Sequence, residues 1–178
     1  FSEQDALRII PLAHAWYLLK GHAIHFTGIR YMSEKITLSH GSGGRQSAEL
    51  IKKVFVSRFR MSGPLTDSAI LEEEGSLQAF TTDSYVVDPV FFPGGNIGKL
   101  AICGTVNDLA VSGAVPHFIS ASFIIEEGFP LDELEQIAGS MKEEAEEASV
   151  KIVTGDTKVV GRGKCDRIFI TTAGTGKL

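Results

Sequence analysis

The stretch FTTDSYVVDPVFFPGGNIGKLAICGTVNDLAVSGAVP, residues 80–116, carries the clearest structural signal in this chain. A β-rich run over 77–87 leads through a Gly-rich turn into an apolar helix, which we predict over 96–113 with Gly113 at its end. The conspicuous polar residues of the stretch are nevertheless acidic: Asp83, Asp88 and Asp108. Taken alone, this combination fits a phosphate loop, a metal site or neither, so the surrounding sequence has to discriminate.

Composition and charge limit the class of protein. The 178 residues are 43% hydrophobic and 22% charged, as in an ordinary globular domain that is long enough to bury one core. A net charge of -5 leaves no broad basic field, so we expect no nucleic-acid partner. The two cysteines, Cys103 and Cys165, form neither a disulfide framework nor a CxxC pair. We therefore expect a reduced, cytoplasmic protein in which Cys103 serves packing.

Residues 1–31 differ from the remainder. Lys20 and Arg30 interrupt their uncharged runs, so the segment is too short to span a bilayer, and it lacks a signal-peptide layout. We expect no membrane partner. Met32 is placed like a natural start of translation, so we interpret 1–31 as an extension, either upstream sequence or a cloning remnant, and 32–178 as one domain. The alternative is a genuine helix that packs on the domain.

The rest of the chain alternates helices and strands. Helical periodicity predicts helices over 44–59 and 130–149, the latter strongly amphipathic. Short apolar or β-branched runs predict strands over 118–125, 150–160 and 167–174. With the two elements of the opening stretch, this order favours an α+β domain in which helices cover one side of a mixed sheet.

Two Gly-rich turns are candidates for anion binding. GGNIGK, residues 94–99, resembles a Walker A loop only superficially, because Pro93 and Leu100 stand where that motif needs a glycine and a hydroxyl. Lys99 is therefore not a P-loop lysine. GSGGR, residues 41–45, directly precedes a predicted helix, whose free amide groups favour an anion. A flexible leader with a helix cap explains that turn equally well.

Four aspartates lie at or near the ends of predicted elements. Asp108 sits inside an apolar helix and needs a partner, since an unpaired buried carboxylate is costly. Magnesium is such a partner, because it takes carboxylate ligands and completes its shell with phosphate oxygens and water. An acidic protein can thus bind a polyphosphate through metal ions. The alternative is that these residues merely cap helices and turns: Asp67, Asp83, Asp108 and Asp156.

At this point the chain resembles a known family. The opening stretch, LSHGSGG (38–44), IIEEGFP (124–130) and IVTGDTKVV (152–160) are similar, in the same order, to the HypE carbamoyl dehydratases of the PurM-like ATP-binding superfamily. The resemblance covers about Lys35 to the end. It implies a PurM-like N-terminal domain with a mixed four-stranded sheet, helices on one side, and a homodimer that places ATP near its interface.

The resemblance also implies an activity and a site. HypE proteins use ATP to phosphorylate the oxygen of a carboxamide on a C-terminal cysteine, and loss of phosphate leaves a thiocyanate for the cyanide ligands of nickel-iron hydrogenases. By position, the implied metal ligands are Asp67, Asp83, Asp108 and Asp156, with Thr66 replacing a paired aspartate beside Asp67. The implied nucleotide-binding residues are Gly43, Gly44, Asn107 and Asp156, and the implied catalytic residues are Asp108 and Lys158.

One departure leaves two functions open. The family continues into a second α/β domain that ends in PRIC, whereas this sequence stops at Leu178. The resemblance therefore implies the ATP- and magnesium-binding half of the enzyme, expected to be inactive alone, with the carbamoyltransferase and the iron-cyanide scaffold complex as partners. The alternatives are a dimerising assembly module without turnover, or another PurM-like enzyme such as selenophosphate synthetase or thiamine-phosphate kinase; DSYVVDPVFFPGGNIGK favours HypE.

Overall fold

The computed structural model describes residues 35–178, which divide after Met61 into two compact units. The predicted extension over 1–31 lies outside the described residues. Within 35–178, no helix combines the length and the apolar character needed to cross a membrane.

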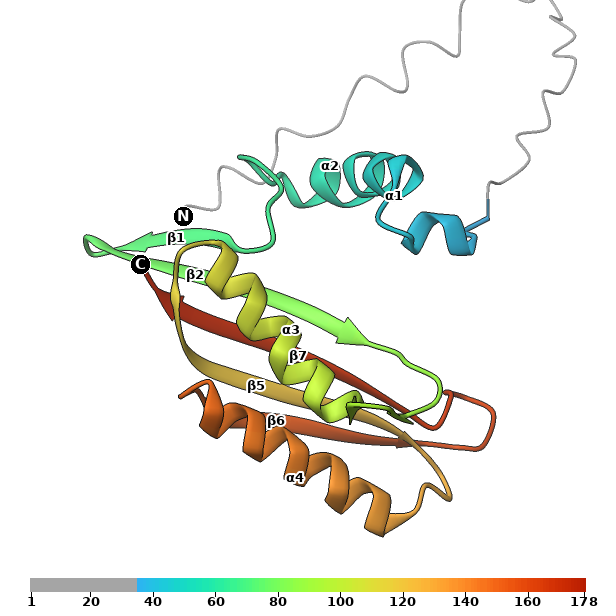
Figure 1. Ribbon diagram of the computed structural model, residues 1–178. Helices are drawn as coiled ribbons and strands as arrows, with labels where there is room; N and C mark the ends of the chain where they lie inside the picture. Colours follow the sequence, from blue (N-terminus) through green and yellow to red (C-terminus); the bar gives the residue numbers. More distant parts are fainter. Residues whose placement is uncertain (1–34) are drawn as a thin grey trace, which may run out of the picture. The chain divides into compact units, whose positions relative to one another are not determined.

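The larger unit, 62–178, is built on a five-stranded sheet of order β1-β2-β7-β5-β6 (Figure 1). Only the β5–β6 pair is parallel, and the other three pairs are antiparallel, so the sheet is mixed. The expected strands over 77–87, 118–125, 150–160 and 167–174 all form. The strands are β1 (Ala69–Glu73), β2 (Ser76–Tyr85), β5 (Val115–Glu126), β6 (Lys151–Val160) and β7 (Ile168–Lys177).

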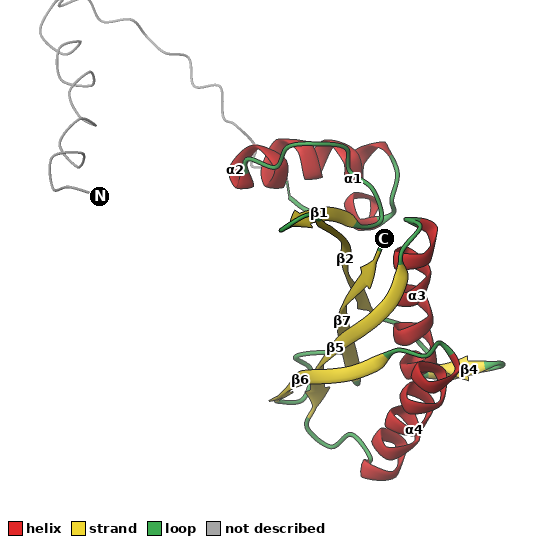
Figure 2. Cartoon of the chain, turned by 90° about the vertical axis from the view of Figure 1, so that its left-hand side faces the viewer, coloured by secondary structure: helices red, strands yellow, loops and turns green. Residues whose placement is uncertain are grey.

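Two helices, α3 (Ile97–Val111) and α4 (Leu131–Glu147), lie on the same side of this sheet (Figure 2). Asn96 caps α3, because its side chain accepts hydrogen bonds from the amides of Gly98 and Lys99. The amphipathic pattern of α4 buries Ile137, Met141 and Ala145. Both helices were predicted, and the α+β arrangement with helices on one side is confirmed.

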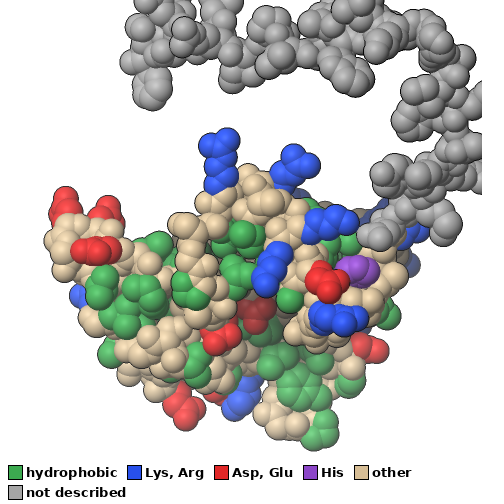
Figure 3. All heavy atoms as spheres, turned by 90° about the horizontal axis from the view of Figure 1, so that it is seen from above, with side chains coloured by type: hydrophobic (Ala, Val, Ile, Leu, Met, Phe, Trp, Pro, Cys, Tyr) green, Lys and Arg blue, Asp and Glu red, His purple; other side chains and the backbone are tan. Residues whose placement is uncertain are grey.

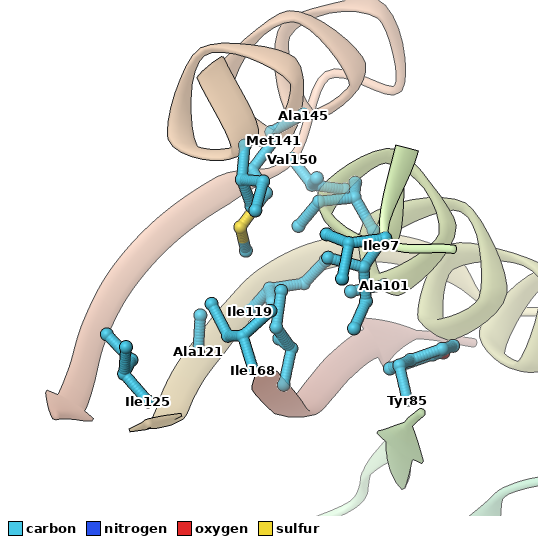
Figure 4. Packing of buried hydrophobic residues seen from close by; sticks show 14 residues of the cluster. Tyr85, Ile97, Ala101, Ile119, Ala121, Ile125, Met141, Ala145, Val150 and Ile168 are labelled. Carbon is cyan, nitrogen blue, oxygen red and sulfur yellow. The ribbon is translucent and has the colours of Figure 1, made fainter. Parts of the chain in front are cut away.

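The hydrophobic core lies between the helices and the sheet. Figure 4 shows side chains of α3 and α4 converging on those of β5 and β7. Along β7, every second residue from Ile168 to Gly176 is buried, as expected for a strand with one covered face. The other face of the sheet carries no helix of this unit (Figure 2).

The sheet has five strands, so the expected count of four is wrong. The additional strand is β1, which pairs with β2 at the sheet edge and has all five residues exposed. Its sequence, AILEE, therefore lacks the apolar alternation of a half-buried strand. Glu74 and Gly75, both with positive φ, close the two-residue hairpin between β1 and β2. A separate hairpin of β3 (Phe91–Phe92) and β4 (Gly95–Asn96) was also not predicted.

The smaller unit, over its described residues 35–61, is helical. A 3-10 turn, η2 (Leu38–Gly41), precedes one continuous helical segment composed of α1 (Arg45–Leu50), the π-helical η3 (Ile51–Val56) and α2 (Ser57–Phe59). This segment matches the helix predicted over 44–59. Its Phe55 and Phe59 rings stack with 6.0 Å between centroids. On the molecular face drawn in Figure 3, Lys and Arg side chains are interspersed with acidic and hydrophobic ones.

Candidate functional site

Asp108 lies in the last turn of α3, with its carboxylate directed to β2. Its Oδ2 accepts a hydrogen bond from the hydroxyl of Thr81, at 3.1 Å. The same hydroxyl lies 2.7 Å from the main-chain oxygen of Asp67. A hydroxyl has a single hydrogen, so Thr81 shares it between the two acceptors. Thr81, which is only 4% exposed, therefore links the end of α3 to the segment that leads into β1.

The main chain of Asp108 is held as well. Its carbonyl oxygen accepts hydrogen bonds from the hydroxyls of Ser68 and Ser112, each at 2.9 Å. Ser68 is 2% exposed, and its own carbonyl accepts a bond from Thr66 at 2.7 Å. Thr66, which replaces an aspartate expected from the resemblance, thus has a structural contact here. These bonds fix the backbone on which the Asp108 carboxylate stands.

Two further carboxylates come near Asp108. Asp83 follows Thr81 by two positions on β2 and therefore points to the same face of the sheet. Burial raises the pKa of Asp108 above its ordinary value, the Thr81 hydrogen bond lowers it, and the charges of Asp83 and then Asp67 raise it further. The charges of Asp83 and Asp67 therefore both act on Asp108.

This acidic group suits a hard cation in its chemistry. None of the ion pairs formed within 35–178 supplies a lysine or arginine to these three carboxylates. Asp108 also stands at the negative end of a helix, where a positive charge is favoured. Carboxylate oxygens are ligands that magnesium prefers. The three carboxylates do not form a complete metal-binding cluster. Among the described residues, no three acidic, His or Cys side chains lie close enough together to hold one metal ion.

Asp156 and Lys158 lie elsewhere in the sheet. Both are exposed on the edge strand β6, and they pair in register with Ser122 and Ile124 of β5. Ser122 alternates with the buried Ala121, so Asp156 and Lys158 share the face of the sheet that α3 and α4 leave open. Three strand spacings of about 4.8 Å, roughly 14 Å in all, separate β6 from β2. Within one chain, Asp156 is therefore not joined to Asp83.

The remaining expected residues occupy two other places. Asn107 is exposed and lines a cavity of about 310 Å³ between α3 and α4. Gly43 and Gly44 belong to the smaller unit. Gly43 has a φ of 74°, and its amide donates to the hydroxyl of Ser47 at 2.9 Å, directly before the helical segment. These two glycines are therefore not part of the unit that contains Asp67, Asp83 and Asp108.

Lys99 and Cys103 share a carboxylate partner on α4. The Lys99 ammonium lies 2.6 Å from Glu144, and the Cys103 thiol donates to the other carboxylate oxygen at 3.3 Å. The hydrogen bond to Glu144 raises the pKa of Lys99, and burial together with Glu144 raises the pKa of Cys103. Lys99 thus joins two helices, which agrees with the interpretation that GGNIGK is not a P-loop. Cys103 is half-buried between them, as expected of a packing residue.

Sequence reasoning missed Thr81 and Ser68, the two buried hydroxyl residues that contact Asp108. A signal for Thr81 was present, because it stands two positions before Asp83 on an alternating strand. Ser68 had no comparable signal, since its partner lies 40 positions along the chain. Local patterns do not report such long-range hydrogen bonds.

Comparison with known proteins identifies the family. Residues 65–178 match the family model described as AIR synthase related protein, N-terminal domain. The chain belongs to this family, and the matched region contains the whole five-stranded sheet. A thiamine monophosphate kinase from Aquifex aeolicus shares the fold at 17% identity, with a TM-score of 0.60 over 75% of this chain and 44% of that one.

The curated relatives confirm the resemblance to HypE. The carbamoyl dehydratase HypE of Rhodobacter capsulatus is 57% identical over 148 residues, which cover 80% of this chain and 43% of that protein. A solved HypE–HypF complex contains a chain 55% identical to this one, with a TM-score of 0.68 over 72% of this chain and 42% of that one. A HypE in complex with ATP is 51% identical, with a TM-score of 0.57 over 81% of this chain and 43% of that one. This chain spans less than half the length of these relatives.

Proposed function

We propose that this chain is the ATP- and magnesium-binding half of a carbamoyl dehydratase that converts a C-terminal S-carboxamide into a thiocyanate for cyanide ligand synthesis. The observation that carries the proposal is that the Thr81 hydroxyl joins the Asp67 carbonyl to the Asp108 carboxylate, with Asp83 on the same face of β2. None of the ion pairs among the described residues involves these three carboxylates. Like charges held together in this way are stabilised by a cation, and a cation attracts a phosphate. The HypE solved with ATP supports the choice of nucleotide.

In this proposal each group has a limited task. Asp67, Asp83 and Asp108 hold magnesium, which when bound neutralises the charge of the nucleotide phosphates. Gly43 and Gly44 let the backbone approach the nucleotide, because glycine tolerates the positive φ seen at Gly43. Asn107 contacts the nucleotide beside Asp108. Asp156 and Lys158 lie on the open face, so we infer that they reach a nucleotide held by a second copy of the chain.

The chemistry assigned to the full enzyme is a phosphoryl transfer. The γ-phosphoryl group of ATP moves to the carboxamide oxygen, which breaks its bond to ADP, and the amide nitrogen releases one proton. Departure of phosphate together with the second nitrogen proton then leaves the nitrile of the thiocyanate. Such transfers depend on in-line positioning and charge stabilisation. The residues of this chain supply the positioning of the ATP phosphates. We assign the positioning of the acceptor to the part of the relatives that this chain does not span.

Its proposed setting is a cytoplasmic homodimer that meets other hydrogenase maturation proteins. The solved complex of a HypE with HypF supports a partner of this kind, and we extend it to the carbamoyltransferase and the iron-cyanide scaffold complex. The second candidate is an assembly module that dimerises without using ATP. The exposed open face of the sheet suits both functions, whereas the acidic group around Asp108 favours the first.

Calorimetric titration of the chain with ATP tests the proposal. We expect binding in the presence of magnesium, and binding at least about ten times weaker when EDTA removes the divalent cations. Equal affinity under the two conditions would remove magnesium from the account. Heat of dilution alone, at any magnesium concentration, would leave the assembly module as the better function.

A further inference from the structure

We propose that Thr81 is a positioning residue that holds the Asp108 carboxylate and the Asp67 backbone in the arrangement that binds the cation. This inference rests on the proposed function and assigns a role to a residue outside the predicted site. Thr81 itself touches neither the nucleotide nor the ion. It acts through the two groups that share its hydroxyl hydrogen.

The contacts of Thr81 join three separate segments. Its hydroxyl is 2.7 Å from the Asp67 carbonyl and 3.1 Å from Oδ2 of Asp108, while its own backbone sits inside β2. In register, Thr81 lies opposite Gly174 of β7, where α3 packs so closely that a Cβ atom would come 2.7 Å from the Thr105 side chain. One buried hydroxyl thus sets the distance between two candidate ligand positions that are 41 residues apart in the chain.

The hydroxyl has a specific electrostatic task. Asp83 lies on the same face of β2 as Thr81, and Asp67 supplies the carbonyl that shares the Thr81 hydroxyl, so like charges surround Asp108 and their repulsion alone would turn its side chain away. The hydrogen bond from Thr81 holds one oxygen, Oδ2, toward β2 and leaves the second oxygen, Oδ1, without a protein donor among the described residues. A carboxylate fixed in this way offers Oδ1 to a cation at no further cost in side-chain entropy.

Valine at position 81 has nearly the shape of threonine but lacks the donor. Thr81→Val therefore removes the hydrogen bond while it keeps a β-branched residue in the strand. Thr81→Ser keeps the hydroxyl and removes the methyl group. The matched control is Thr82→Val, because the neighbouring Thr82 also donates to a main-chain carbonyl, that of Thr172 at 3.0 Å, but from the opposite face of β2.

The experiment measures the free magnesium concentration that gives half-maximal ATP binding, together with the thermal midpoint of each variant in EDTA without nucleotide. We expect Thr81→Val to need at least about ten times more magnesium than the unmodified chain. Thr81→Ser and Thr82→Val should stay within about threefold. If Thr81→Val does not fold, Thr81→Ala takes its place in the same comparison with Thr81→Ser.

Two results would overturn the inference alone. One is an unchanged magnesium requirement in Thr81→Val while the unmodified chain binds ATP. The other is an equal loss in Thr81→Ser and Thr81→Val, which would assign the effect to the methyl group and to packing. Failure of the unmodified chain to bind ATP at any magnesium concentration would instead overturn the proposed function, and the role of Thr81 would fall with it.

Discussion

Gly98 of α3 lies directly against the backbone of Ile137 in α4. A Cβ atom at Gly98 would come 2.6 Å from the Ile137 carbonyl oxygen and 2.8 Å from the Met141 side chain. Because a backbone oxygen cannot move aside like a flexible side chain, the two helices are as close here as a glycine allows. We expect Gly98→Ala to lower the free energy of unfolding by about 1–3 kcal/mol, measured by urea denaturation.

Gly139 is the matched control for this packing prediction. It also lies inside α4, but a Cβ atom there would meet no atom within 4 Å. Gly139→Ala should therefore raise the free energy of unfolding by about 0.5–1 kcal/mol, through helix propensity alone. If both alanine variants changed the free energy of unfolding in the same direction, the close helix contact at Gly98 would not contribute to stability.

The carboxyl group of Asp108 predicts a pH dependence of stability without metal. Burial first, and then Asp83 and Asp67, raise its pKa in the folded chain above the ordinary value of 3.8. The folded state thus binds this proton more tightly than the unfolded state, and Asp108 destabilises the fold increasingly as pH rises from 3.8 through the folded pKa. Asp108→Asn should match the unmodified chain in acid and exceed its stability at neutral pH.

Urea denaturation of both proteins in EDTA, at intervals from about pH 4 to about pH 7, checks this sign. The difference in unfolding free energy should grow with pH and then level off. A difference that shrinks toward neutral pH would show that the ionised Asp108 stabilises the metal-free fold.

The sequence predicted those elements whose pattern depends on one covered face. The 3.6-residue periodicity of α4 and the apolar runs of β5 and β7 both arise because one side of each element is buried. The sequence did not predict β1, because this strand is exposed at the edge of the sheet and is held by its pairing with β2. Glu74 and Gly75 adopt the positive φ of a tight hairpin, but Glu-Gly is not one of the dipeptides that mark such a turn in a sequence.

The site was predictable in part. That a carboxylate inside an apolar helix needs a partner follows from the sequence, and Asp108 indeed has several contacts. The sequence does not show which residues make these contacts, because Thr81 lies 27 positions away from Asp108 along the chain. Strand order also matters: Asp156 ends on the far edge strand and on the opposite face from Asp83, which only the sheet topology reveals.

The open face of the sheet predicts self-association. Large hydrophobic side chains on this face are substantially exposed, among them Leu71, Phe80, Phe118 and Ile124. Soluble monomers rarely leave a contiguous apolar surface uncovered. We expect light scattering to report a dimer at micromolar concentration, and Phe118→Lys to convert it to a monomer. Leu131→Lys, at the exposed start of α4, is the control that should remain dimeric.

The proposed nucleotide-binding half should not complete the reaction alone. The chain spans 43% of the length of the R. capsulatus HypE, and amide phosphorylation needs the acceptor oxygen held in line with the γ-phosphate. We therefore expect slow ATP hydrolysis at best, and no dehydration of a synthetic peptide that ends in a carbamoylated cysteine. Mass spectrometry after incubation with ATP and magnesium checks this expectation. Loss of one water from the peptide would show that this half suffices.

The measurement that tests the assignment of the metal and nucleotide site most directly is calorimetric titration of Asp108→Asn with ATP and magnesium. Asn keeps the shape of Asp108 and removes the charge that attracts the cation, so we predict affinity at least about ten times weaker than that of the unmodified chain. Asp166→Asn, an exposed aspartate in the loop before β7, should bind as the unmodified chain does. Unchanged affinity in Asp108→Asn would remove Asp108 from the site and contradict the account.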